Sequence, residues 1–444
     1  MMSVFRNISV FLPCLFFLLV WESARGQFLM DMVDTTKDIG KGILSVSKRF
    51  ENLRVGGYIQ TQYQFASEKG AQGFSGGNFS AFSDSRFMIR RGRIRFDYAH
   101  YDKEMHPSLQ FVFQFDGSER GVAIRDFWGR LWENKWRVLS FTTGMFARPF
   151  GYEVNLSSSD REAPERGRMS QILLKTERDL GVMASFEPAR KKNLLKYLKA
   201  DLGIFNGQGL TGPVEFDGYK DVIGQVLVKP MKLSGDFKVG GGVSFLVGGL
   251  RQFTTSSFRL QRSSSGILLF KADSVSSSIG DKLPRKYFGL NGQFKWEHGW
   301  GDTEFRAEYW RGVQTSTRNS TETPGTPLLE ADGSYAPNYI RNFDGAFILI
   351  LQHIKSTRHQ VGIKWDSYDP NTMVSAGQIG QYGSNLNSAD MRYATIGAGY
   401  ICYLNPNLKF TCWYEWVRNE KTQIPGLDRD LSDNVLTLRA QFRF

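Results

Sequence analysis

The feature that most constrains this sequence is an alternation of apolar and polar side chains with a period of two residues. It is clearest over residues 435–444, where Leu, Ala and Phe occupy every second position and Thr, Arg and Gln fill the positions between. A strand rises about 3.3 Å per residue and sends successive side chains to opposite faces, so about ten tilted residues cross an outer-membrane hydrocarbon layer. The pattern therefore predicts a strand with one apolar and one polar face.

The same alternation recurs at 91–98, 109–116, 288–297, 304–309 and 360–366, with aromatic residues gathered at the segment ends. A soluble sheet turns its apolar face inward and its polar face to water. Two alternating faces sustained over about ten residues, with aromatic girdles, are typical of a barrel with lipid outside and a wet lumen inside. We therefore expect an all-β fold, a transmembrane antiparallel β-barrel.

Counting the alternating segments predicts about sixteen strands, joined by short turns such as 405–407 at one rim and long loops such as 316–343 at the other. The predicted strands are 55–66, 87–102, 106–116, 122–133, 137–147, 179–188, 195–206, 221–231, 236–248, 285–297, 302–315, 344–354, 357–367, 392–404, 407–419 and 434–444. Eighteen strands would need a further hairpin inside 249–284, so both counts stay open. A barrel of either size leaves an aqueous channel.

The N-terminal residues predict export. Arg6 precedes an apolar run at 10–21, and the small residues Ala24 and Gly26 fit a cleavage site, so residues 1–26 are expected to be a signal peptide. After it, no apolar run approaches the roughly 20 residues of a membrane-spanning helix. Residues 27–52 have apolar side chains at helical spacing and are expected to form a periplasmic helix or tail, or alternatively a plug or trimerising helix. Residues 53–444 are then the barrel.

Residues 148–178 form a long loop rich in opposed charges. A loop that folds into the barrel would narrow it, and charges across a narrow passage set a field that filters ions. A solvated surface loop is the alternative. The basic candidates for such an anion pathway are Arg148, Arg161, Arg166, Arg168 and Lys175.

A row of arginines adds to these candidates. Arg91, Arg93 and Arg95 share one face of a predicted strand. Guanidinium groups bind oxyanions in a bidentate manner, so the row is a candidate anion track. Alternatively, the three arginines pair with carboxylates of neighbouring strands and stiffen the wall. Basic and acidic residues are nearly balanced on the predicted lumen face, so net charge does not decide between the two.

The stretch 144–151, Gly-Met-Phe-Ala-Arg-Pro-Phe-Gly, resembles a motif of the phosphate-selective porin O and P family. Arg125-Asp126, Glu165-Arg166 and the stretch 178–182 strengthen the resemblance. The motif residues are Gly144, Phe146, Pro149, Phe150, Gly151, Arg178, Asp179 and Gly181. The resemblance implies a sixteen-stranded homotrimeric porin for passive uptake of phosphate or other anions. The terminal Phe444 resembles the signature that the barrel assembly machinery reads in outer-membrane proteins.

Other classes of function lack support in the sequence. We find no convincing nucleophile–base set, and the five histidines show no metal-ligand spacing beyond His353 and His359, an incidental pair that spans a turn, so we expect no enzyme, metal or cofactor. Export argues against a nucleic-acid partner. Cys402 and Cys412 flank a predicted turn and would form either a cross-strand disulfide or two apolar thiols.

These observations favour an outer-membrane porin that lets small hydrophilic solutes diffuse passively, with anions such as phosphate as expected solutes. Its expected partners are outer-membrane lipid, small anions, two further copies of the chain and the assembly machinery. The alternative is a non-conducting surface barrel that acts as an adhesin or structural protein. An inward position of the loop 148–178 favours transport, and an exposed position favours adhesion.

Overall fold

The computed structural model describes residues 52–104, 106–188, 194–211, 214–274 and 278–444. The predicted signal peptide and residues 27–51 lie outside the described residues. The chain divides into the units Met1–Arg54 and Val55–Phe444, and the second unit is the barrel considered below. Among the described residues, no helix is long and apolar enough to cross a membrane.

Strands account for most of the second unit. They are β1 (Leu53–Ala66), β2 (Ser85–Tyr101), β3 (Pro107–Ser118), β4 (Gly121–Trp132), β5 (Leu139–Ala147), β6 (Arg178–Phe186), β7 (Leu198–Phe205), β8 (Asp221–Ser234), β9 (Phe237–Arg251), β10 (Ser256–Arg262), β11 (Leu268–Ser274), β12 (Lys282–His298), β13 (Gly301–Ser316), β14 (Asn338–His353), β15 (His359–Asp369), β16 (Tyr393–Asn405), β17 (Leu408–Asn419) and β18 (Val435–Arg443). The helical pieces are short: α4 (Arg168–Leu173), η2 (Leu194–Tyr197), η3 (Gly209–Thr211), η5 (Ala376–Gln378) and η6 (Ser388–Asp390).

Sixteen of the strands form a closed antiparallel wall, which confirms the predicted fold class and strand count. Each strand pairs with the next in sequence, except that β9 pairs directly with β12, from Lys282↔Arg251 to Trp296↔Phe237. The first and last strands close the wall, from Tyr58↔Arg443 to Ala66↔Val435. Closure leaves no strand edge unpaired, as a barrel in lipid requires.

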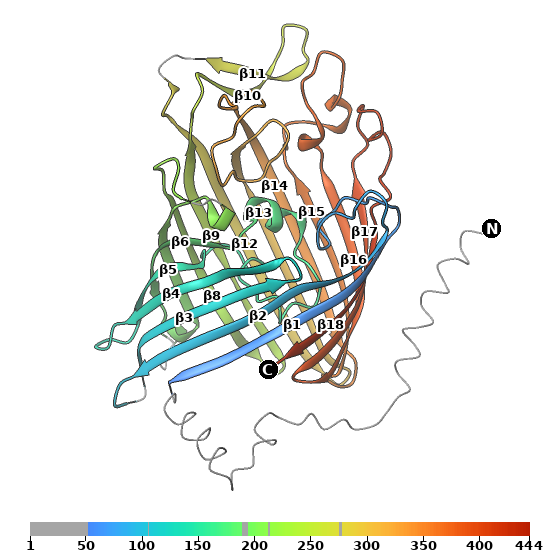
Figure 1. The fold of residues 1–444 in the computed structure, drawn as a ribbon. Helices are drawn as coiled ribbons and strands as arrows, with labels where there is room; N and C mark the ends of the chain where they lie inside the picture. The colour runs from blue at the N-terminus through green and yellow to red at the C-terminus, as the bar shows by residue number, and fades with distance from the viewer. Residues whose placement is uncertain (1–51, 105, 189–193, 212–213, 275–277) are drawn as a thin grey trace, which may run out of the picture. The chain divides into compact units, whose positions relative to one another are not determined.

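The hairpin β10–β11 lies within the segment where an extra hairpin was considered, but it stands outside the wall. Its strands pair with each other, and β10 runs parallel to the outer end of β14 at Ser257↔Asn338. Figure 1 shows both strands beyond the end of the barrel. The amide of Gln252 donates to the Asp281 carbonyl at 2.9 Å and that of Gly280 to the Gln252 carbonyl at 2.8 Å, which closes the β9–β12 wall beneath the hairpin. The eighteen-strand alternative is therefore wrong.

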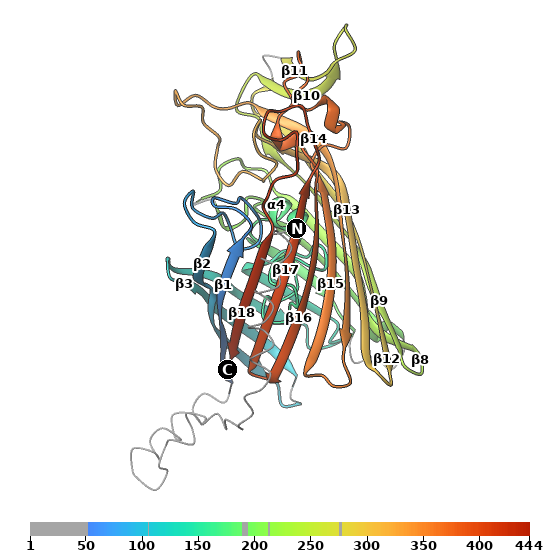
Figure 2. The ribbon, with the colours of Figure 1, turned by 90° about the vertical axis from the view of Figure 1, so that its right-hand side faces the viewer.

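The two faces of the wall have the polarity expected of a membrane barrel. Outward side chains such as Phe127, Leu131 and Ile363 are apolar and more than half exposed, whereas inward side chains such as Gln64 and Asp126 are polar and buried. This inversion is typical of a barrel with lipid outside. The long loops gather at the end that carries β10 and β11, and the C-terminus lies at the other rim (Figures 1 and 2).

The register also bears on the two cysteines. Cys402 faces Phe410 and Cys412 faces Tyr400, so the two cysteines are diagonal neighbours across β16 and β17. Diagonal residues have Cα atoms about 7–8 Å apart, beyond the usual span of a disulfide. No disulfide joins the two in the described part of the chain.

Because β9 pairs directly with β12, we predict that the barrel folds without its outer hairpin. Replacing residues 253–279 with a Gly/Ser turn of about four residues should leave the thermal unfolding midpoint nearly unchanged. The control Gly249→Val should lower the midpoint, because a Cβ at Gly249 would lie 2.3 Å from the Leu283 carbonyl oxygen inside the wall. Heat-modifiable gel migration and circular dichroism measure both. Loss of the folded form in the hairpin deletion would contradict the assignment.

Candidate functional site

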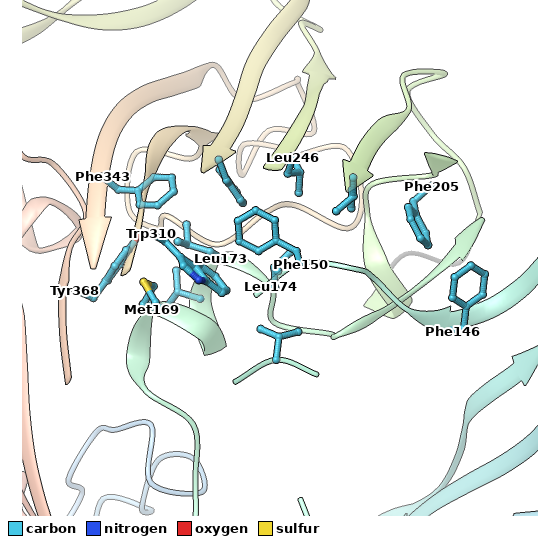
Figure 3. Close-up of a cluster of buried hydrophobic side chains, with 14 of the residues drawn as sticks. Phe146, Phe150, Met169, Leu173, Leu174, Phe205, Leu246, Trp310, Phe343 and Tyr368 are labelled. Atoms are coloured by element: carbon cyan, nitrogen blue, oxygen red, sulfur yellow. The ribbon is translucent and has the colours of Figure 1, made fainter. Parts of the chain in front are cut away.

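The segment between β5 and β6, residues 148–177, lies inside the lumen and is called the inner loop below. Its Phe150 is fully buried, with its ring 4.8 Å from that of Trp310 in an edge-to-face arrangement and 6.0 Å from that of Tyr287. Figure 3 shows Phe150, Leu173 and Leu174 of the loop packed among side chains that project inward from the wall. The loop thus fills part of the lumen with an apolar core.

Two glycines of the motif 144–151 occupy positions that require glycine, Gly144 inside β5 and Gly151 in the inner loop. Gly144 has φ +116°, and a Cβ there would lie 2.4 Å from the Phe127 carbonyl oxygen. Gly151 has φ +69°, and a Cβ there would lie 2.4 Å from Glu308 Oε1. Both positions combine a left-handed backbone with a close approach that excludes larger residues. The motif 144–151 therefore carries a backbone requirement for docking the loop.

Polar groups of β13 and β15 hold one side of the inner loop. The Glu308 carboxylate accepts hydrogen bonds from the amides of Tyr152 at 2.6 Å and Glu153 at 2.9 Å. Lys364 pairs with the Glu153 carboxylate. The buried loop backbone thus finds its hydrogen-bond partners on the wall.

Groups on β1, β17 and β18 hold the other side. The hydroxyl groups of Tyr58 and Ser158 are 2.6 Å apart. Lys409 Nζ donates to the carbonyl of Ser159 at 2.8 Å, and Arg439 Nη1 donates to that of Pro164 at 2.7 Å. These strands continue the wall beyond β15 and β16, so the inner loop, which begins at β5 and ends at β6, is attached along an arc of the wall from β13 to β1.

Two loop carboxylates each collect several arginines. Glu165 pairs with Arg91 at 2.7 Å, Arg90 at 2.8 Å and Arg439 at 2.7 Å. Burial alone would raise the pKa of the Glu165 carboxyl, but these three charges lower it well below its usual range. The carboxylate therefore stays ionised in the lumen.

The second such carboxylate is Glu177. It pairs with Arg125 at 2.7 Å and with Arg166. Its pKa is also held well below the usual range, because the charges of Arg166, Arg125 and Arg178 outweigh the effect of burial. Each carboxylate is thus already saturated with guanidinium partners.

A cavity of about 610 Å³ lies between the inner loop and strands β2 to β4. Its lining contains eight basic and four acidic side chains. The basic side chains are Arg90, Arg91, Arg93, Arg120, Arg125, Arg161, Arg166 and Lys175, and the acidic ones are Asp116, Glu119, Glu165 and Glu177. The wall of the cavity therefore has an excess of positive charge.

Arg161 stands out among these residues. It is 6% exposed, and its Nε and Nη1 atoms have no hydrogen-bond partner in the described part of the chain. Burial, together with the like charges of Arg166 and Arg91, lowers the pKa of its guanidinium group. The side chain therefore lies at the cavity wall with two buried donors that no protein group satisfies.

The predicted arginine row divides in the structure. Arg91 and Arg93 line the cavity, and Arg93 also pairs with Asp116 at 2.8 Å. Arg95 lies nearer the other rim and pairs with Asp97 at 2.9 Å. All three arginines thus have carboxylate partners, but only that of Arg93 lies on a neighbouring strand: Arg91 pairs with Glu165 of the inner loop, and Arg95 pairs within β2.

The basic residues of the inner loop also have different surroundings. Arg161, Arg166 and Lys175 line the cavity. Arg148 does not: it is 2% exposed and buried beside Asp179 and Arg285. Arg168 lies away from the same cavity, between two aromatic rings. These positions cannot be predicted from alternation or composition, because they depend on how the loop packs.

The other motif residues lie where they support the wall and the loop. Phe146 packs on Phe205 with ring centroids 5.3 Å apart, and Pro149 is buried. Arg178 pairs with Asp126 at 3.0 Å, and the Asp179 carboxylate accepts from the Gly207 amide at 2.7 Å. A Cβ at Gly181 would lie 2.4 Å from the Ile204 carbonyl oxygen. The backbone of Phe444 hydrogen-bonds to that of Gly57 across the closing seam.

Sequence reasoning missed two features of the site. Arg90 binds Glu165 although strict alternation places it on the opposite face from Arg91. Residues 67–84, between β1 and β2, also turn into the lumen, where Ser75 contacts Glu415 of β17. Only the two adjacent glycines, Gly76 and Gly77, hint at an unusual backbone there, and both have positive φ. Among the described residues, no group of acidic, His or Cys side chains could hold a metal.

Comparison with solved structures finds barrels of the same kind. The outer membrane channel DcaP of Acinetobacter baumannii is similar over 88% of this chain and 97% of its own, with a TM-score of 0.53 and 11% identity. OprB of Pseudomonas putida is similar over 92% and 98%, with a TM-score of 0.52 and 9% identity. The chain has the fold of these channels. No protein-family model matches the sequence, and a search of curated proteins finds no match.

We predict that Phe150 anchors the inner loop. Phe150→Ala should weaken loop docking by about 3–5 kcal/mol, the usual cost of removing a buried ring, while the barrel stays folded. Hydrogen–deuterium exchange of the loop amides should rise. Phe127→Ala, which removes a ring that is 59% exposed on the outer face, is the matched control and should leave exchange unchanged. Equal exchange of the loop amides in Phe150→Ala and Phe127→Ala would contradict the role of Phe150 as the anchor of the inner loop.

We also predict that Glu165 holds the inner loop against β2 and β18, the strands on either side of β1. Glu165→Gln leaves the buried Arg91 and Arg439 and the partly exposed Arg90 without their carboxylate partner, and should cost about 3–5 kcal/mol of docking. Because the folded pKa is lowered, the stabilisation is complete above the unfolded value of about 4.3 and is lost only as the pH falls through the folded value. The difference in loop-amide exchange between the wild type and Glu165→Gln, corrected for intrinsic rates, should therefore be the same at pH 7 and pH 5. Exposed Glu68→Gln is the control, and a difference that shrinks by pH 5 would refute the assignment.

Proposed function

We propose that this chain is an outer-membrane channel through which small hydrophilic solutes diffuse passively, with a preference for anions. The observation that carries the proposal is the cavity between the inner loop and β2 to β4, with its excess of basic side chains. Its carboxylates are already paired, as shown for Glu165 and Glu177. Charge in a narrow passage walled by protein acts on permeating ions more strongly than charge in open water.

Arg161 is the residue of the passage whose charge is least compensated. It lines the cavity, its Nε and Nη1 atoms are buried without partners, and no carboxylate of the described residues forms an ion pair with it. Guanidinium groups bind carboxylates and phosphates with paired donors. The resemblance of the motif 144–151 to the phosphate-selective porins supports phosphate as the first solute to test. The same resemblance supports a homotrimer. The apolar run 10–21 supports export by the signal peptide 1–26, and the terminal Phe444 supports recognition by the barrel assembly machinery.

A second candidate function is adhesion. The hairpin β10–β11 packs with β14 and with the loop between β15 and β16 in a separate apolar cluster that includes Phe270, Tyr339 and Leu386. Such a structured outer element offers a binding surface to a partner outside the cell. A barrel that does not conduct ions would favour this candidate over the channel.

We predict that the purified protein conducts ions with an anion-signed zero-current potential in a planar bilayer under a KCl gradient. Arg161→Gln should lower the ratio of anion to cation permeability about 1.4- to 5-fold, the equivalent of about 0.2–1 kcal/mol for a screened charge. Arg262→Gln, an exposed change in the outer hairpin, is the control and should leave the ratio unchanged. Absence of conductance would overturn the channel proposal.

Phosphate is tested in the same bilayers. If phosphate occupies the cavity, adding it should block the chloride current of the wild-type protein, and Arg161→Gln should weaken the block. Anion preference without any block would keep the channel and remove phosphate as its particular solute.

A further inference from the structure

The loop between β1 and β2, residues 67–84, lies in the lumen beside the inner loop. Gln171 Nε2 of the inner-loop helix α4 donates to the Phe74 carbonyl at 3.0 Å. The ring of Phe74 packs against the apolar core that Phe150 anchors. On the far side, the Ser75 hydroxyl donates to the Glu415 carboxylate. The tip of this loop therefore bridges from the inner loop to β17.

Arg168 joins the tip to the wall. Its guanidinium carbon lies 4.6 Å from the ring centroid of Phe74 and 3.5 Å from that of Tyr393 on β16. A guanidinium group between two aromatic faces is attracted to both, and the attraction strengthens where water is excluded. Arg168 is 9% exposed, so this contact is largely dry. It holds Phe74 at a fixed place across the lumen.

The base of the same loop is fixed by Arg86. This arginine donates to the carbonyl groups of Asn78 at 2.7 Å and Gly77 at 2.8 Å, and its guanidinium carbon lies 4.0 Å from the Phe79 ring centroid. The loop is thus tied at its base and at its tip. Both ties draw it inward, away from the outer solvent.

The position of the tip matters because it lies between two cavities. A second cavity, of about 600 Å³, is bounded by residues 72–78, by Arg168 and Tyr393, and by Asp433 of an outer loop. It shares Gly76, Arg90, Gln171 and Lys175 with the cavity that Arg161 lines. The opening between the two cavities is therefore bordered by Gly76 of the loop 67–84, by Arg90 of β2, and by Gln171 and Lys175 of the inner loop.

We propose that the loop 67–84 is a second constricting element, and that Phe74 and Arg168 are the positioning residues that set the width of the opening between the two cavities. This inference deepens the proposed function and rests on it. It also gives Arg168 a role that differs from direct contact with a permeating anion.

The test compares two phenylalanines of the same loop in planar bilayers. Phe74→Ala removes the ring that packs on Arg168, and Phe82→Ala removes one that is 91% exposed. In 1 M KCl, where the Debye length is about 3 Å, changes in charge have little effect on conductance. Phe74→Ala should raise single-channel conductance about twofold and admit larger neutral polyethylene glycols, because pore radius limits both. Phe82→Ala and Phe74→Tyr should behave like the wild type.

Arg168→Ala supplies an independent variant. If the two residues act through one contact, Arg168→Ala should raise conductance as Phe74→Ala does, and the double variant should add little to either. Heat-modifiable migration confirms that each variant folds. A folded Phe74→Ala channel with the conductance and polymer cut-off of Phe82→Ala would overturn the inference, as would fully additive effects. A wild-type protein that does not conduct would instead overturn the proposed function.

Discussion

The Glu165 carboxylate is the interaction on which the inner architecture depends. It receives guanidinium groups from β2 and β18, the two strands that flank β1, and so bridges the closing seam of the barrel from inside. A carboxylate this deeply buried is tolerated because its partners compensate the loss of water. The same pairs fix one side of the inner loop, while the apolar core around Phe150 fixes the other. The cavity between the inner loop and β2 to β4 keeps its shape because the Glu165 ion pairs and the Phe150 core together fix the loop.

The wall could be predicted almost completely from the sequence, because alternation is a local property of each strand. Each barrel strand was expected at its place, and the ends differ by a few residues, as with β14, which begins at Asn338 rather than 344. The outer hairpin β10–β11 shows the limit. Its residues alternate like a wall strand, yet pairing between β9 and β12 excludes it. Only the partners of a strand decide whether it belongs to the barrel.

The interior of the barrel could be predicted only in part. The density of charged residues marked the loop 148–178 as a candidate site, but it did not indicate which of its arginines line the cavity. Arg148 and Arg161 are alike in sequence terms and both are buried, but Arg148 lies beside Asp179 away from the cavity, whereas Arg161 lines it. The inward path of residues 67–84 also had no sequence signal beyond its glycines, of which Gly70, Gly76 and Gly77 have positive φ. The motif 144–151, which suggested the family resemblance, lies at the end of β5 and the start of the inner loop, and its Phe150 packs in the core that anchors the loop.

Because β9 pairs with β12 beneath the outer hairpin, the barrel wall and the hairpin β10–β11 are structurally separate parts of one chain. Backbone hydrogen bonds at Gln252, Gly280 and Asp281 complete the wall below the hairpin. Residues between these points can change in length and sequence without disturbing the register of the strands or the lining of the lumen. The outer hairpin is therefore free to diversify while the wall beneath it is preserved.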